Sequence, residues 1–421
     1  MNTPLHRMRQ PRSFLFRNLQ LLDPRFQETR GGYEVLVEDG EFKEVSDVPI
    51  RSATAHVVDC GGRTLMPGLI DCHVHIYLSE VNLTLLEHVP VSLLTARAVP
   101  LLRSMLDRGF TTVRDTGGAD WGIREAVEKG FVRGPRLFIS GRAIGPTGGH
   151  SDMRRRTDYQ PSCRCCNGLR FSLATADGVD AVRATVREEL RQGADAIKIM
   201  VSGGVASPYD PLDSRQFSLP EIAAAVEEAH AFNRYVLAHA YTPEAIERAL
   251  SQGVRTIEHG NLIDPRTAQM LAERQGYLVA NLVTYVVMQE RAAQFGMNEE
   301  KLQKNARVLR GGFESLEICR RAGVKVGFGS DLLGELQEEQ SREFLIRSEV
   351  VPALEIIRSA TLVGAEIVRM PGRLGIIEPG AIADLILIDG DPLTDLSLFQ
   401  DQGAHIPLVL KQGRVMKNLC F

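Results

Sequence analysis

Strand-like apolar runs alternate with helical segments along most of this chain of 421 residues. Eight of these runs have the length and residue types of buried β-strands. They cover residues 65–75, 111–115, 136–140, 196–200, 235–239, 256–259, 277–282 and 325–330. The segments between them repeat apolar residues at the helical period, as in 220–232, where Ser218 is the expected N-cap and Glu221 lies in the first turn. The alternation predicts an α/β fold, a (β/α)8 TIM barrel.

Both ends of the chain instead show short β-like runs. Residues 33–38 and 42–45 flank Asp39-Gly40, and residues 408–410 and 414–417 flank Gln412-Gly413, which are tight-turn signals for hairpins. We therefore expect one small β-sandwich domain built from both termini. The predicted division is 1–65 for its first part, 66–370 for the barrel and 371–421 for its second part.

Composition narrows the range of partners. The formal net charge is -4 and the isoelectric point about 6.2, so there is no electrostatic reason to expect binding to nucleic acid or an anionic membrane. No stretch approaches the roughly 20 apolar residues of a membrane span, and the basic N-terminus lacks the apolar core of a signal peptide. Seven cysteines, an odd number, fit a reducing cytoplasm. We expect a cytoplasmic protein with a small-molecule or dipeptide substrate, and a homo-oligomer is left open.

The first barrel strand ends in two histidines, His73 and His75, one residue apart. Side chains alternate between the faces of a strand, so both point the same way and are close enough to share a metal ion. Taken alone, the pair could equally be solvated or hydrogen-bonded.

Four further polar residues lie within or at the ends of later apolar strands: Lys198, His239, His259 and Asp331. In a TIM barrel the active site lies at these carboxyl ends. Lys198 is either paired with a neighbouring carboxylate or carboxylated by carbon dioxide, which would let it bridge two cations. Each histidine alone is more often a core residue, and Asp331 alone could be a helix N-cap. Together they indicate a metal site.

These six residues resemble the binuclear metal site of the amidohydrolase superfamily, whose barrel is accompanied by a β-sandwich from both chain ends. Segments 147–152 (TGGHSD), 198–204 (KIMVSGG) and 239–244 (HAYTPE) resemble those of the Xaa-Pro dipeptidases, or prolidases, within it. The resemblance covers nearly the whole chain, through the stretch 374–384.

The resemblance implies a role for each site residue. His73, His75 and Asp331 would hold the more buried metal, and His239 and His259 the more exposed one. Carboxylated Lys198 would bridge two divalent ions, with Zn²⁺ the expected metal. Asp331 would also act as general base and acid for attack by a metal-bridged hydroxide. Tyr241 would stabilise the developing oxyanion, and His150 and Tyr241 would contact the substrate.

The expected activity is therefore zinc-dependent hydrolysis of the amide bond in a dipeptide or N-acyl amino acid, with Xaa-Pro as the best single choice. A detoxifying amidase for an ochratoxin-like N-acyl amino acid is the alternative within the same chemistry. A mononuclear deaminase or cyclic amidase of the superfamily is a further alternative, although it would not need Lys198.

Two clusters have a simpler interpretation. The run Arg154-Arg155-Arg156 is typical of a solvated face, although one arginine could attract an anionic substrate. Cys163, Cys165 and Cys166 lack a fourth ligand at zinc-knuckle spacing, so we interpret them as loop thiols.

Overall fold

The computed structural model describes residues 13–157, 171–207, 209–295 and 297–420. The cysteine cluster of residues 163–166 lies outside these ranges. The described residues form two compact units. The first runs up to Ile70 and also contains Arg103–Thr112 and the chain from Pro352 onward; the second contains Asp71–Leu102 and Val113–Val351. The domain boundaries expected at residues 65 and 370 stay a prediction.

Strands from both chain ends form the sheet of the first unit. They are β1 (Ser13–Leu21), β2 (Arg30–Glu38), β3 (Glu41–Ser46), β4 (His56–Asp59), β5 (Thr64–Pro67), β16 (Leu385–Ile388), β17 (Leu408–Lys411) and β18 (Arg414–Asn418). The sheet is 8-stranded in the order β18-β17-β16-β5-β1-β2-β3, with β4 paired to β1. The terminal segments therefore share one sheet, and its closure into a sandwich stays a prediction.

Both expected hairpins are confirmed. β2 pairs with β3 and β17 with β18, each antiparallel. In the two turns the backbone is left-handed at both central residues, with φ of 49° at Asp39, 90° at Gly40, 50° at Gln412 and 67° at Gly413. This geometry matches the twist of antiparallel strands and explains why Asp-Gly and Gln-Gly stand there.

The strands of the alternating region form two further sheets. They are β6 (Leu69–Val74), β7 (Phe110–Asp115), β8 (Arg136–Ile139), β9 (Ala143–Gly145), β10 (Leu173–Thr175), β11 (Ile197–Met200), β12 (Val236–Ala240), β13 (Thr256–His259), β14 (Tyr277–Ala280) and β15 (Lys325–Phe328). One sheet is 3-stranded, β6-β7-β8, and the other is 7-stranded, β10-β9-β11-β12-β13-β14-β15. Neighbouring strands of the 7-stranded sheet pair in parallel.

The single strand expected over 65–75 is wrong, because the chain forms β5 and then β6 with a break at Gly68. The backbone N–H of Gly68 bonds to the Asp384 carbonyl, and that of Leu69 to the Gly109 carbonyl, so pairing changes partner there. A Cβ at Gly68 would lie 2.2 Å from Thr111 Oγ1, which leaves room only for glycine. The other seven expected strands are present, and β9 and β10 were not expected.

Helices follow most of these strands. The α-helices are α1 (Val91–Asp107), α2 (Trp121–Glu128), α3 (Val179–Arg191), α4 (Leu219–Ala231), α5 (Pro243–Ser251), α6 (Pro265–Glu273), α7 (Val283–Glu290), α8 (Glu299–Ala322), α9 (Arg342–Arg347), α10 (Ala353–Ser359) and α11 (Leu362–Ile367). Short 3₁₀ helices are η1 (Leu83–His88), η2 (Gly334–Glu339), η3 (Leu396–Phe399) and η4 (Asp401–Gly403). Ser218 and Glu221 form the capping box of α4, as expected from the sequence.

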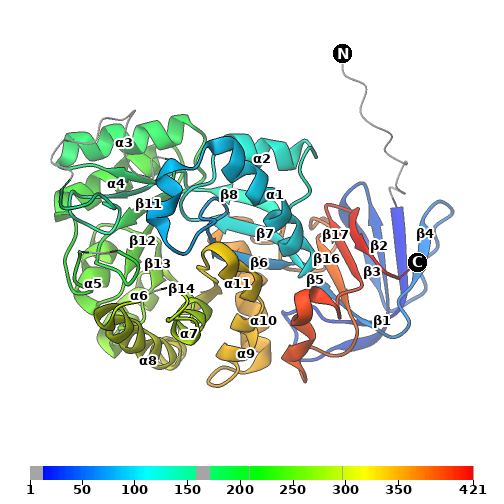
Figure 1. Ribbon diagram of the computed structural model, residues 1–421. Coiled ribbons are helices and arrows are strands. Elements are labelled where there is room, and N and C mark those ends of the chain that lie inside the picture. The colour runs from blue at the N-terminus through cyan, green and yellow to red at the C-terminus, as the bar shows by residue number, and fades with distance from the viewer. Residues whose placement is uncertain (1–12, 158–170, 208, 296, 421) are drawn as a thin grey trace, which may run out of the picture. The chain divides into compact units, whose positions relative to one another are not determined.

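In the second unit, helices α3 to α8 lie along the outer side of strands β11 to β14 (Figure 1). Their apolar faces and the strands bury one core that includes Val186, Ile199, Ile222 and Ile257. The backbone N–H groups of Ser330 and Asp331 bond to the His73 carbonyl, which joins the segment after β15 to β6. Closure of these strands into a complete eight-stranded barrel stays a prediction.

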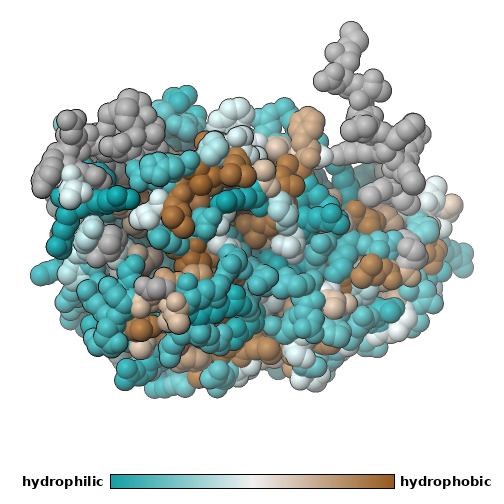
Figure 2. Space-filling view, in the orientation of Figure 1, coloured by the Kyte–Doolittle hydropathy of each residue, from teal (hydrophilic) through white to brown (hydrophobic). Residues whose placement is uncertain are grey.

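The surface adds two observations. Figure 2 shows apolar residues gathered in a patch on a face that is otherwise mostly hydrophilic. At the start of α1, the side chains of Val91 and Leu93 are exposed. None of the helices in the described ranges combines the length and hydropathy that crossing a membrane requires.

Candidate metal centre

The expected ligands lie within or just after five strands. His73 lies in β6 with His75 just after it, Lys198 lies in β11, His239 in β12 and His259 at the end of β13, and Asp331 follows β15. They line one cavity of about 80 Å³ together with His150 and Tyr241. The residues that the sequence singled out are therefore neighbours in space.

His73, His75 and Asp331 form the tightest group. Asp331 Oδ1 lies 3.2 Å from His73 Nε2 and 3.1 Å from His75 Nε2. Burial raises the pKa of Asp331, but the charge and hydrogen bond of His73 and the hydrogen bond of His75 outweigh it and hold that pKa well below its usual value. One ligand atom from each of the three residues lies within 4.8 Å of the others, which makes this trio a candidate metal site.

His239 and His259 stand beside this trio. Their ring centroids are 4.4 Å apart, and the His259 ring is 5.1 Å from that of His73. Burial lowers the pKa of His259 to about 3 and that of His239 well below its usual value. Both rings are therefore neutral near pH 7, the form in which an imidazole binds a metal ion.

Lys198 is buried between these groups, with 1% of its surface exposed. Burial lowers the pKa of its ammonium to about 8, although Glu258 and Asp331 raise it in opposition. Part of the amine is therefore neutral near neutral pH, and a neutral amine is the form that reacts with carbon dioxide. Imidazole nitrogens and a carboxylate oxygen are donors that suit a divalent metal ion.

Two of these residues have strained backbones. His259 and Asp331 have φ values of 73° and 52°, in the left-handed region that β-carbon sterics disfavour. The backbone N–H of Asp331 is held by the His73 carbonyl at 2.9 Å. Such strain persists where the surrounding structure over-determines a conformation, as at functional sites.

His150 packs directly against the proposed ligands. Its ring stacks on that of His239 with centroids 4.3 Å apart, and its Nδ1 lies 2.7 Å from Ser207 Oγ. A Cβ at Gly204 would lie 2.0 Å from the His150 ring, so the second glycine of the 198–204 segment makes space for it.

Tyr241 is buried, and its ring stacks on that of His259 with 5.0 Å between the centroids. Its hydroxyl lies 2.7 Å from that of Tyr285. Burial raises the pKa of Tyr241 well above its usual value, so the phenol stays protonated and can donate a hydrogen bond.

Arg154, the first residue of the arginine run, is held by Asp152. Its Nε and Nη2 atoms lie 2.7 Å and 2.6 Å from the two carboxylate oxygens. This bidentate pairing orients Arg154 locally.

Three further site residues were missed by sequence reasoning: Tyr285, Arg114 and Glu258. Tyr285 lies in α7 within an apolar segment, so nothing in the sequence distinguishes it from a core residue. Arg114 and Glu258 are charged residues inside apolar strands, which is the same signal that pointed to Lys198.

Comparisons with known proteins identify the family of this chain. The sequence profile of the Amidohydrolase family matches residues 64–416, and the chain belongs to that family. Among solved structures, an amidohydrolase is 54% identical with a TM-score of 0.94 and covers 96% of this chain and 99% of its own. A prolidase complexed with N-methylphosphonate-L-proline is 48% identical with a TM-score of 0.93, covering 96% of this chain and 100% of its own. The ochratoxinase of Aspergillus niger is 29% identical over 375 residues, which is 84% of this chain and 76% of that protein.

Proposed function

We propose that this chain is a metal-dependent hydrolase that cleaves the amide bond of Xaa-Pro dipeptides or N-acyl amino acids. The observation that carries the proposal is the convergence of His73, His75 and Asp331, with their ligand atoms within 4.8 Å of one another, beside His239, His259 and Lys198. Similarity to a prolidase and to an ochratoxinase, both named for cleaving such bonds or substrates, supports it.

In this proposal the residues hold two divalent ions, with zinc as the expected metal. His73, His75 and Asp331 bind one ion, and His239 and His259 bind the other. Lys198, carboxylated on Nζ, stands between them. Its burial and its pKa of about 8 support this reaction, because a fully charged ammonium would not add to carbon dioxide.

Each side chain has a task in amide hydrolysis. Bound divalent ions supply hydroxide near neutral pH by lowering the pKa of a water molecule. Asp331 accepts a proton during attack on the carbonyl carbon and passes it to the nitrogen as the C–N bond breaks. The Tyr241 hydroxyl donates to the former carbonyl oxygen, and His150 binds the free carboxylate of the substrate. The products are a carboxylic acid and the freed amine of an amino acid.

The cavity lining supports a neutral, apolar acyl group. Apart from the proposed ligands and substrate-binding residues, its walls are mostly aliphatic and thioether side chains, namely Leu78, Leu83, Met153, Met200, Val205, Met288 and Leu333. Such walls also suit the alternative substrate, a bulky ochratoxin-like N-acyl amino acid, which the ochratoxinase relative favours.

One experiment separates these functions. The zinc-loaded chain is assayed against Xaa-Pro, Xaa-Arg, N-acyl amino acids and an ochratoxin-like amide, with metal content measured on the same sample. We expect about two ions per chain, as in two-metal hydrolases, and fastest cleavage of Xaa-Pro. Full activity with one ion per chain, or deamination without any amide cleavage, would contradict the proposal.

Replacing Tyr241 with phenylalanine should lower kcat by about 100-fold, the usual cost of one oxyanion donor, and change KM little. The phenylalanine ring keeps the stacking on His259 but loses the hydroxyl that bonds to Tyr285. Steady-state kinetics on the best substrate check this, with Tyr33→Phe in β2 as a control of the same chemistry. An unchanged kcat would remove Tyr241 from the reaction.

A further inference from the structure

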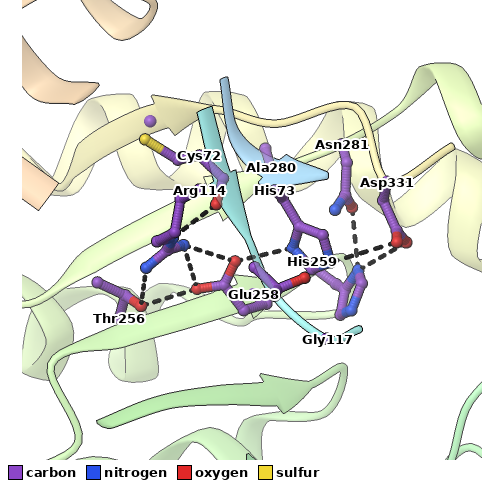
Figure 3. Close-up of polar contacts among 12 residues, drawn as sticks. Cys72, His73, Arg114, Gly117, Thr256, Glu258, His259, Ala280, Asn281 and Asp331 are labelled. Atoms are coloured by element: carbon purple, nitrogen blue, oxygen red, sulfur yellow. Dashed lines mark hydrogen bonds and ion pairs between the residues drawn. The ribbon is translucent and has the colours of Figure 1, made fainter. Parts of the chain in front are cut away.

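Glu258 is a fully buried carboxylate that the mechanism above does not use. It lies in β13 directly before His259, yet its side chain contacts a different ligand, His73 of β6 (Figure 3). Its Oε2 atom accepts a hydrogen bond from His73 Nδ1 at 2.8 Å. The exposed fractions of the two side chains are 0% and 1%.

Arg114 of β7 anchors this carboxylate. Its Nη2 lies 2.8 Å from Oε1 and 2.9 Å from Oε2 of Glu258, and its Nε donates to the Cys72 carbonyl at 2.6 Å. The hydroxyl of Thr256 adds a bond of 2.7 Å to Oε1. Every oxygen of Glu258 is therefore engaged, and the carboxylate has one fixed orientation toward His73.

The charges agree with this geometry. The guanidinium of Arg114, which stays protonated in proteins, donates to both oxygens of Glu258. Glu258 is therefore a carboxylate, which can only accept hydrogen bonds. Its partner Nδ1 must then carry a hydrogen, so Nε2, which lies 3.2 Å from Asp331 Oδ1, is the ring nitrogen that remains to bind an ion.

We infer that Glu258 is a positioning residue for the metal centre: anchored by Arg114, it fixes the tautomer and the ring orientation of His73 so that Nε2 is ready to bind the ion. The inference rests on the proposed role of His73 as a metal ligand. Carboxylates that hold a ligand histidine in this way typically contribute 10–100-fold to metal affinity.

The variant Glu258→Gln tests this without any turnover assay. Glutamine keeps the shape but loses the charge that orients His73 and pairs with Arg114. We expect zinc affinity, measured by competition with a chromogenic chelator, to fall about 10–100-fold. We also expect the visible spectrum of the cobalt-substituted protein to change, because the ligand ring is no longer held.

The chain offers a matched control in Glu343→Gln. Glu343 is equally buried, its Oε1 pairs with Arg347 at 2.6 Å, and its Oε2 accepts from the backbone of Leu282 and Val283. It is therefore a carboxyl side chain with the same burial and an arginine partner, but Arg347, Leu282 and Val283 are not among the proposed ligands. Zinc affinity should stay near the wild-type value in this variant. The inference would be overturned if both variants lost zinc affinity equally, or if a folded Glu258→Gln variant lost none.

A measurement on the wild-type chain tests whether Glu258 fixes the tautomer of His73, even if the Glu258→Gln variant does not fold. With ¹⁵N-labelled histidine, the His73 resonances, assigned by their loss in His73→Asn, should report a protonated Nδ1 before metal is added. A hydrogen on Nε2 instead would overturn the inference. Wild-type protein that binds no zinc would count against the proposed function, while the tautomer measurement would still judge the role of Glu258.

Discussion

Lys198→Ala should abolish amide hydrolysis. Alanine removes the only side chain among the described site residues that can become a carbamate, and with it the proposed bridge between the two ions. The loss should exceed the roughly 100-fold that follows removal of a residue behind a ligand, because here a ligand itself is lost. Initial rates on the best Xaa-Pro substrate, together with metal content, measure it.

Chemical rescue identifies the missing group. Short carboxylic acids such as formate or propionate have the two oxygens of the carbamate and fit the space that alanine leaves, so they should restore part of the activity. Lys198→Met keeps the volume and should not be rescued, because no space is opened. Lys129→Ala, at an exposed helix position paired with Glu125, should behave as wild type. A Lys198→Ala variant with full activity would remove the bridge from the mechanism.

The convergence of the proposed ligands on one cavity could be predicted because parallel strands bring their carboxyl ends together. His239 and His259 are separated in the sequence, but Ala240 of β12 pairs with His259 of β13, so the two histidines come close in space. A polar residue at the end of an apolar strand therefore has its place in space fixed by the strand order alone. The pattern also predicted both terminal hairpins, since the turn residues adopt conformations that few residue types favour.

Other features depend on contacts that no local pattern contains. The break at Gly68 follows from its close approach to Thr111, which lies 43 positions further along the chain. The short strands β9 and β10 have three residues each, below the length at which alternation is informative. Tyr285 enters the site only because α7 begins directly after β14 and turns this ring toward Tyr241.

Glu258 and Arg114 could be predicted only in part from the sequence. The sequence signals that each is costly to bury, since each is a charge in an apolar strand. It does not say that they neutralise one another, because β7 and β13 are separated by more than a hundred residues. Lys198 carries the same signal and was assigned to the site through the resemblance of the six residues to the metal site of the amidohydrolase superfamily.

Asp331→Asn should lower kcat by about 10²–10⁴-fold, the contribution expected of a positioned general base. Asparagine is nearly the same size and keeps an oxygen that can face His73 and His75, but it cannot accept a proton. The left-handed backbone at this position, with φ of 52°, also suits asparagine better than most residues, so the loop should keep its conformation. The chain should therefore fold normally and react slowly.

Metal loss must be separated from loss of the base, since Asp331 is proposed to serve as both ligand and proton acceptor. Rates are therefore measured across a zinc titration, and kcat is taken at the plateau where added metal no longer helps. Asp264→Asn is the matched control, because Asp264 caps α6 through a bond from Thr267, and asparagine caps a helix equally well. If Asp331→Asn reached the wild-type kcat once saturated with zinc, the proton would have to travel by another group, and His150, stacked on His239 at the edge of the same cavity, would be the next residue to replace.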